Sequence, residues 1–112
     1  MFDVRINRMR KLTTLTACAV LITGMSGAAI AADGASLYAS KMCSTCHGAD
    51  GKTPVMPSYP KVAGQNKDYT LQQIKDIRDG NRTNGLTAAM KGMIAGVTDS
   101  DAKKIAGWLA SQ

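Results

Sequence analysis

Two cysteines and a histidine fall within one five-residue stretch, Cys43-Ser44-Thr45-Cys46-His47. A Cys-x-x-Cys-His stretch predicts covalent attachment of a c-type haem. Each thiol adds to one vinyl group of the porphyrin, and two intervening residues let one helical turn present both sulfurs to the same ring edge. The imidazole of His47 then lies beneath the ring, where a nitrogen can bind the iron axially. The chain is therefore expected to fold around this cofactor.

Three other interpretations of this stretch have to be weighed. A thioredoxin-like redox pair needs a helix N-terminus within a βαβ unit, and no alternating apolar run predicts such a sheet. A structural zinc site needs four ligands, whereas Cys43, Cys46 and His47 are the only cysteines and histidine after residue 32. The third interpretation is a disulfide-bonded hairpin with a coincidental spacing. The missing sheet and the missing fourth ligand favour haem.

Residues 1–32 have the pattern of a cleaved secretory signal peptide. Residues 1–11 carry four basic side chains against one acidic one, residues 12–30 are uncharged and largely apolar, and the small residues that follow predict cleavage after Ala31 or Ala32. A retained membrane anchor is the alternative, but residues 24–27 interrupt the apolar run and no basic segment follows it. Cys18 loosely fits a lipoprotein cleavage box, yet most of the apolar core comes after it. We expect one domain, residues 33–112.

The net charge and the predicted export of the domain argue for some classes of function and against others. Residues 33–112 hold 10 of the 14 basic residues and seven of the eight acidic ones, which leaves a net charge of +3. This modest charge, without interleaved aromatic and basic residues, argues against nucleic-acid binding. Two cysteines in an oxidising compartment would otherwise form a disulfide, so export itself supports haem attachment. The predicted location is the periplasm, without stable membrane insertion after cleavage.

The expected domain is small and poor in aromatic residues. Its 80 residues are close to the lower limit for an unaided hydrophobic core. Its aromatic side chains are Tyr38, Tyr59, Tyr69 and Trp108. A covalently held haem would supply the missing apolar volume, so the chain is expected to fold poorly without it.

Periodicity and capping residues predict an all-α fold. A helix is expected over residues 34–46, running into the haem motif, followed by an irregular loop with three prolines over residues 48–64. A second helix is expected from Asn66 or Lys67 to Asp79, ended by Gly80. Its apolar face is expected to contain Tyr69, Ile74 and Ile77.

Two more helices are expected toward the C-terminus. A short one over residues 86–95 is interrupted by Gly92. Thr98 and Asp101 form a variant capping box, with Asp in place of Glu, that starts a helix reaching Ala110. The apolar face of this last helix is expected to contain Ala102, Ile105, Ala106 and Leu109.

Several segments resemble one family. These segments are Cys-Ser-Thr-Cys-His-Gly-Ala-Asp-Gly-Lys at 43–52, Pro-Lys-Val-Ala-Gly-Gln at 60–65, Tyr69 with Ile74, Asp-Gly-Asn-Arg at 79–82, Met-Lys-Gly-Met at 90–93 and Asp-Ser-Asp at 99–101. The domain resembles a class I cytochrome c of the small single-haem bacterial kind called c-553, and one half of a dihaem cytochrome c4. The resemblance implies three main helices, a short helix and loops wrapped around one covalent haem c. It also places Gly34, Tyr38, Ile105 and Trp108 where the first and last helices cross, although Tyr38 lies one residue further from the motif than is common.

The residues leave the second axial ligand open. A thioether sulfur favours Fe(II) and raises the potential, and the candidates after residue 32 are Met42, Met56, Met90 and Met93. Met42 adjoins the attachment turn and cannot reach the opposite face, and the family runs the loop that holds Met56 behind the histidine. By resemblance the first methionine of the Met-x-x-Met pair is the ligand, so Met90 is predicted, with Met93 as runner-up. The alternatives are two core methionines, or an open position that binds gases or peroxide.

The resemblance also assigns supporting residues. A ligating imidazole normally donates its second N–H to an acceptor, and the family uses the backbone carbonyl at Pro60, where a proline can serve because only its C=O is needed. Gln65 and Arg82 are candidates for contacts near the haem propionates. A solvated turn residue is the alternative for Arg82.

The prediction is a periplasmic electron-transfer protein that carries one electron between redox proteins through a His/Met-ligated haem c. We expect no enzyme, because nothing resembles an acid/base pair or a nucleophile triad. Lys41, Lys52 and Lys91 neighbour the motif and the ligand segment and could steer acidic partners, although solvated lysines need no such role. The alternatives are a haem subunit of a larger periplasmic dehydrogenase or sulfur-oxidising complex, and a ligand-binding or peroxidatic haem protein.

Overall fold

A computed structural model describes residues 25–112, with side chains from Asp33 onward, so most of the predicted signal peptide lies outside the described residues. This part of the chain forms five helices and no strand, which confirms the all-α prediction for it. The helices are α1 (Met25–Ser40), α2 (Ser44–His47), α3 (Lys67–Asp79), α4 (Thr87–Ile94) and α5 (Asp99–Ala110). None of the helices within residues 25–112 combines the length and the apolar character that a membrane crossing requires.

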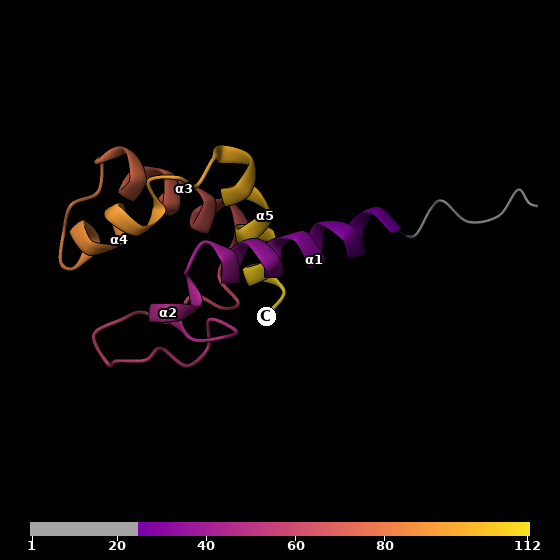
Figure 1. Cartoon of the computed structure of the whole chain (residues 1–112), viewed down its shortest axis with the longest axis horizontal. Coiled ribbons are helices and arrows are strands. Elements are labelled where there is room, and N and C mark those ends of the chain that lie inside the picture. Colours follow the sequence, from indigo (N-terminus) through magenta and orange to yellow (C-terminus); the bar gives the residue numbers. More distant parts are fainter. Residues whose placement is uncertain (1–24) are drawn as a thin grey trace, which may run out of the picture.

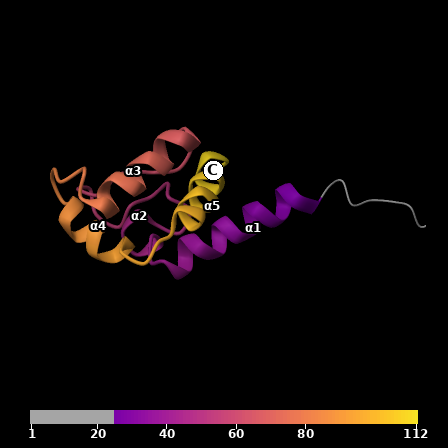
Figure 2. The same ribbon diagram turned by 90° about the horizontal axis from the view of Figure 1, so that it is seen from above.

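Helices α1 and α5 cross in close contact, as both views show (Figures 1 and 2). Gly34 makes the approach possible, because a Cβ there would clash with the carbonyl oxygen of Lys104 and lie 2.6 Å from the Cβ of Trp108. The ring of Trp108 packs on that of Tyr38 with centroids 4.9 Å apart. Ile105 is buried in the same core. The predicted contacts at the helix crossing are therefore confirmed.

The predicted continuous helix over residues 34–46 is wrong, because a turn at residues 41–43 divides it into two helices. Helix α1 ends at Ser40, and Met42 takes the left-handed conformation, with φ of 68°. The amide of Cys43 bonds to the carbonyl of Tyr38 at 3.0 Å, and the amide of Met42 bonds to that of Ala39 at 3.1 Å. This pair of bonds is the Schellman ending, in which glycine usually fills the left-handed position. It turns the chain so that the haem motif forms a separate short helix, α2.

The segment over residues 48–64 is irregular, as predicted. It folds back on itself through a bond of 2.9 Å from the amide of Val62 to the carbonyl of Gly51. The amide of Gly64 bonds to the carbonyl of Leu109 at 2.8 Å. The first bond closes the loop on itself, and the second attaches its end to α5.

Helix α3 begins and ends where the sequence predicts. The side chain of Asn66 accepts a bond of 3.0 Å from the amide of Tyr69, and Gly80 ends the helix with φ of 82°. The apolar face is only partly as predicted. Tyr69 is 53% exposed, and Thr70 is buried beside Ile74 and Ile77 instead. The spacing 70, 74, 77 is the i, i+4, i+7 pattern, and Tyr69 lies one position off it.

Helix α4 lies where a short helix was expected, but the predicted interruption is wrong, because the helix runs through Gly92 from Thr87 to Ile94. Helix α5 follows the prediction. Both bonds of the capping box between Thr98 and Asp101 are present at the start of α5. The buried side of α5 is the predicted one, Ala102, Ile105, Ala106 and Leu109. Together with residues of α1 and α3, it lines the inner wall of the site.

Candidate functional site

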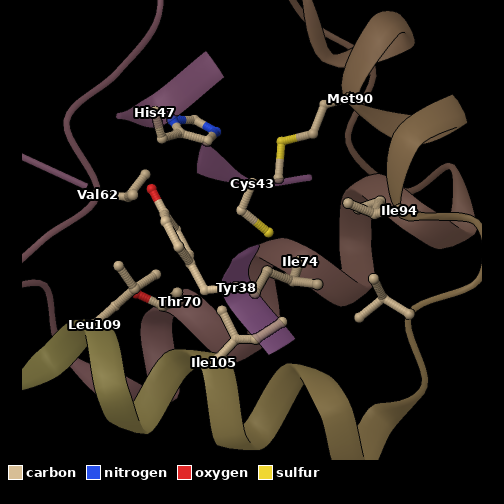
Figure 3. Close-up of a pocket in the computed structure, with 11 residues that line it drawn as sticks. Tyr38, Cys43, His47, Val62, Thr70, Ile74, Met90, Ile94, Ile105 and Leu109 are labelled. Carbon is tan, nitrogen blue, oxygen red and sulfur yellow. The ribbon is translucent and has the colours of Figure 1, made fainter. Parts of the chain in front are cut away.

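A cavity of about 520 Å³ opens between α2, α3, α4 and the segment over residues 58–65. Its volume lies within the roughly 300–1,000 Å³ typical of cofactor and ligand sites. It leads to a narrower pocket of about 50 Å³ against α1 and α5 (Figure 3). The wall of this inner pocket is mostly apolar and includes Tyr38, Val62, Thr70, Ile74, Ile105 and Leu109. The cavity therefore combines a large volume with an apolar inner lining, as an iron porphyrin requires.

One helical turn brings the attachment residues to this cavity. The amide of His47 bonds to the carbonyl of Cys43 at 3.0 Å, so the motif closes a single turn. Cys43, Cys46 and His47 all line the cavity as a result. The two thiols are free. This is the arrangement in which two thioether bonds and one axial ligand can come from the same short helix.

The buried ring of His47 is oriented by a backbone group. Its Nδ1 atom lies 2.8 Å from the carbonyl oxygen of Pro60. A carbonyl can only accept, so Nδ1 carries a proton, and Nε2 is the ring nitrogen whose lone pair the neutral imidazole offers to a metal. Figure 3 shows the ring extending from α2 toward the side of the pocket where the Met90 thioether lies. The contact expected for Pro60 is present, and His47 has the tautomer that an iron ligand needs.

The methionines differ in their relation to the cavity. Met90 is half-buried on α4 and lines both the outer cavity and the inner pocket. Its thioether points toward the space that the ring of His47 enters (Figure 3). Met93 is 47% exposed and lines the outer cavity only. Met42 lies at the outer cavity and is exposed, and Met56 is not among the lining residues. Met90 is thus the methionine whose burial and position suit an axial ligand best.

The polar side of the cavity is built around Arg82. Its Nη1 donates to Gln73 at 2.9 Å, and its Nε donates to Asn84 at 3.0 Å. Gln65 also lines the cavity, and its side-chain oxygen accepts a bond from the amide of Asn66. Arg82 is therefore held by side chains from α3 and the following turn, with further N–H groups available for an anionic substituent.

Of the three lysines expected near the site, one lines the cavity. Lys41 does so, and its Nζ lies 3.7 Å from Asp101. Lys52 and Lys91 are exposed and are not among the lining residues. Lys61, which the sequence analysis did not single out, lines the cavity instead. The loop that carries it has no periodicity from which its direction could be predicted.

The structure argues against the thioredoxin-like and zinc interpretations of the motif. Burial, with a smaller effect of Cys46, raises the pKa of Cys43 to about 11, whereas a thioredoxin-type thiol has a lowered pKa. Residues 25–112 also lack the strands of a βαβ unit. Over the same residues, no cluster of three or more His, Cys, Asp or Glu side chains could hold a metal ion. The donor set fits attachment to a porphyrin better than a redox pair or a zinc site.

The inner wall contains a buried tyrosine. The hydroxyl of Tyr38 donates to the carbonyl oxygen of Gly48 at 2.6 Å, which joins α1 to the residue directly after the motif. Burial raises the pKa of Tyr38 to about 12, with smaller contributions from Cys43 and Asp50. The hydroxyl therefore stays protonated and keeps this bond. Thr70 and Gln73, also missed from the sequence, line the α3 side of the cavity.

Comparison with known proteins gives consistent results. A family model for cytochrome c matches residues 31–112. Cytochrome c4 of Pseudomonas aeruginosa is 42% identical over 95 residues, which cover 83% of this chain and 45% of that protein. Cytochrome c-553 of Nitratidesulfovibrio vulgaris is 37% identical over 101 residues, which cover 90% of this chain and 96% of that protein.

A solved structure supports the fold. The crystal structure of reduced recombinant cytochrome c4 from Pseudomonas stutzeri matches with a TM-score of 0.65 and 31% identity, over 74% of this chain and 48% of that one. The chain spans about half the length of the cytochrome c4 relatives that it matches. The family match includes the Cys43–His47 motif and all of α2 to α5. The chain therefore belongs to the cytochrome c family, as a small class I member that carries a covalently attached haem c.

Proposed function

We propose that this protein is a periplasmic, single-haem electron carrier that passes one electron between redox proteins and is not itself an enzyme. The proposal rests on one observation: the same cavity is lined by the attachment cysteines, by the buried His47 that Pro60 orients, and by the half-buried Met90. Bound haem supplies a one-electron Fe(III)/Fe(II) couple. His47 and Met90 would hold its iron from two sides.

The side chains explain why such a site carries electrons well. His47 and Met90 would hold the cofactor in both oxidation states, so little rearrangement of the protein would accompany electron transfer. The thioether of Met90 would favour the reduced state. The apolar wall formed by Tyr38, Ile74 and Ile105 excludes water from the inner side. Arg82 would place a positive charge near the acidic substituents of the ring.

The ligand assignment is tested by a matched pair of variants of the holoprotein. Met90→Ala is expected to abolish the sulfur-to-iron charge-transfer band in the optical spectrum and to let the reduced protein bind carbon monoxide. Met93→Ala removes the same group three residues further on and is expected to keep the band. Survival of the band in Met90→Ala would exclude Met90. Rapid carbon monoxide binding by the unaltered protein would favour the ligand-binding alternative.

Export is tested separately. N-terminal sequencing of the haem-containing protein recovered from the periplasm is expected to begin at Ala32 or Asp33, because cleavage is predicted after Ala31 or Ala32. A protein that retains residues 1–30 would contradict the proposed cleavage and favour the anchor.

A second candidate function is favoured by one relative. A thiosulfate dehydrogenase electron acceptor of Stutzerimonas stutzeri is 32% identical over 102 residues, which cover 45% of that protein. By analogy, the chain could serve a larger periplasmic dehydrogenase or sulfur-oxidising complex. Reduction of the purified haem protein by thiosulfate only when periplasmic extract is added, together with stoichiometric co-purification of an enzyme, would support this role. Rapid exchange with several small redox proteins and no co-purifying enzyme would favour the free carrier.

A further inference from the structure

Two cations hold the short connection between α4 and α5, residues 95–98. The Nη1 atom of Arg78, on α3, donates to the carbonyl oxygen of Val97 at 3.0 Å and lies 2.8 Å from Asp99 Oδ1. From the other side, Nζ of Lys41 lies 3.5 Å from the carbonyl oxygen of Gly96. Consecutive carbonyls of the connection are thus bound by residues of two other segments.

Arg78 makes the stronger of the two contacts. Its guanidinium also forms two parallel bonds to Asp79, at 2.8 Å from Nε and 3.1 Å from Nη2. Its side chain is only 17% exposed. Bidentate pairing fixes the guanidinium plane, so the bond to Val97 starts from a rigid donor. The Lys41 contacts are longer and add less.

The connection is joined closely to the end of α4. This helix has only eight residues, too few to be stable by itself, and it packs chiefly against α3. Its last residue, Ile94, is buried together with Val97, and the amide of Val97 bonds to the carbonyl of Ile94 at 2.9 Å. Movement at Val97 would therefore be passed to α4, one turn of which separates Ile94 from Met90.

We propose that Arg78 is a positioning residue for Met90: by binding Val97 and Asp99, it fixes the α4–α5 connection and keeps the Met90 thioether in the cavity. The inference rests on the proposed ligation of iron by Met90. Arg78 itself does not line the cavity. Its effect is therefore indirect, through the backbone of residues 94–97.

The test measures how often Met90 leaves its position. Carbon monoxide can bind the reduced holoprotein only after the thioether has moved away, so its binding rate reports this event. Arg78→Met keeps a long side chain and removes all donors, and is expected to raise the rate roughly tenfold, the effect of losing a bond to a charged group. Arg78→Lys keeps one charged donor, so its rate of carbon monoxide binding is expected to lie between the rates of Arg78→Met and the unaltered protein.

Two controls separate positioning from other effects. Lys103→Met removes one positive charge from an exposed position of α5 outside this contact set and is expected to leave the rate unchanged. Ala106→Gly weakens the buried side of α5 without touching the connection. It lowers the melting temperature and is expected to leave the rate nearly unchanged.

The outcomes are distinguishable. If carbon monoxide binds Arg78→Met no faster than Lys103→Met, this inference is overturned and the proposed function still stands. The same holds if Ala106→Gly binds carbon monoxide as fast as Arg78→Met does. A charge-transfer band that survives Met90→Ala would overturn both. If Arg78→Met does not fold, Asp99→Asn takes its place, because it removes one anchor of Arg78. It should give a smaller acceleration, and no acceleration would contradict the inference.

Discussion

The Nδ1 atom of His47 lies 2.8 Å from the carbonyl oxygen of Pro60, 13 residues further along the chain. The imidazole of the motif is thus oriented by the loop that follows it, through a backbone atom that no side-chain replacement removes. What a substitution at position 60 can change is the stiffness of the loop that presents this carbonyl. The chemistry of His47 therefore depends on the geometry of residues 48–64.

Replacement of Pro60 by glycine is expected to raise the midpoint potential of the holoprotein. A looser loop weakens the bond to Nδ1, so in the proposed ligation His47 becomes a poorer donor to iron, which disfavours Fe(III). A loss of about 1 kcal/mol in this bond corresponds to roughly 40 mV for a one-electron couple. Equilibrium redox titration measures the shift. Pro57→Gly, an equal loosening of the same loop away from the carbonyl, is the control, and equal shifts in both variants would contradict the prediction.

Two glycine-to-alanine substitutions are expected to have opposite effects on stability. At Gly34, a Cβ would clash with Lys104 O and lie 2.6 Å from the Cβ of Trp108, so α1 and α5 must separate. Overpacking of this kind costs about 1–3 kcal/mol. At Gly92, in α4, a Cβ meets nothing within 4 Å, and alanine should gain about 0.5–1 kcal/mol from helix propensity.

Urea unfolding of the holoproteins, followed by circular dichroism, checks both signs of the glycine prediction. A Gly34→Ala variant as stable as the unaltered protein would show that the two helices do not approach as closely as described.

The helix boundaries that depend on local signals were predicted from the sequence. Asn66, Gly80 and the Thr98–Asp101 box act through bonds to nearby amides and carbonyls, so their residue types are sufficient evidence. The break before α2 was missed, because the left-handed position of its Schellman ending is filled by Met42, a residue with no preference for that conformation.

The site could be predicted only where short motifs encode it. Cys43, Cys46 and His47 are adjacent in sequence, and the family resemblance extended the prediction to Pro60 and Met90. Lys61 and Gln73 reach the cavity through tertiary packing that no local pattern records. The contact of Arg78 with Val97 joins residues 19 positions apart, and neither residue type indicates the other.

Acidification is expected to destabilise the protein through the carboxylates around Arg78. Hydrogen bonds from Arg78 lower the pKa of both Asp79 and Asp99 below the ordinary value of 3.8. The folded state then binds fewer protons than the unfolded state as these groups titrate, so the free energy of unfolding decreases as the pH is lowered. Their contribution is present above about pH 4 and is lost as the pH falls through the folded-state values.

Asp99→Asn removes one of these carboxylates, so the fall in the free energy of unfolding below about pH 4 should be shallower than in the unaltered protein. Urea unfolding at a series of pH values measures this pH dependence of the free energy of unfolding. Asp68→Asn, which removes an exposed carboxylate of α3 outside the network, should keep the original slope. Parallel curves for Asp99→Asn and the unaltered protein would contradict the assignment.

Production of the chain without haem attachment is expected to leave it poorly folded. Without the porphyrin, apolar residues of the inner wall, among them Ile74, Ile94 and Ile105, have no apolar partner on the cavity side, which costs hydrophobic stabilisation. Proteins are stable by only about 5–15 kcal/mol in total, so this cost weighs heavily in a small domain. Partial collapse of α4 would reduce the cost, because this short helix packs chiefly on α3.

Far-UV circular dichroism of residues 33–112 without haem is therefore expected to show reduced helicity and a broad thermal transition. The holoprotein, measured in parallel, should unfold cooperatively. The crossing of α1 and α5 is the part best able to survive, since Gly34, Tyr38 and Trp108 contact one another without the cofactor. A haem-free chain with the helicity and cooperativity of the holoprotein would show that the polypeptide closes its core by itself, against this prediction.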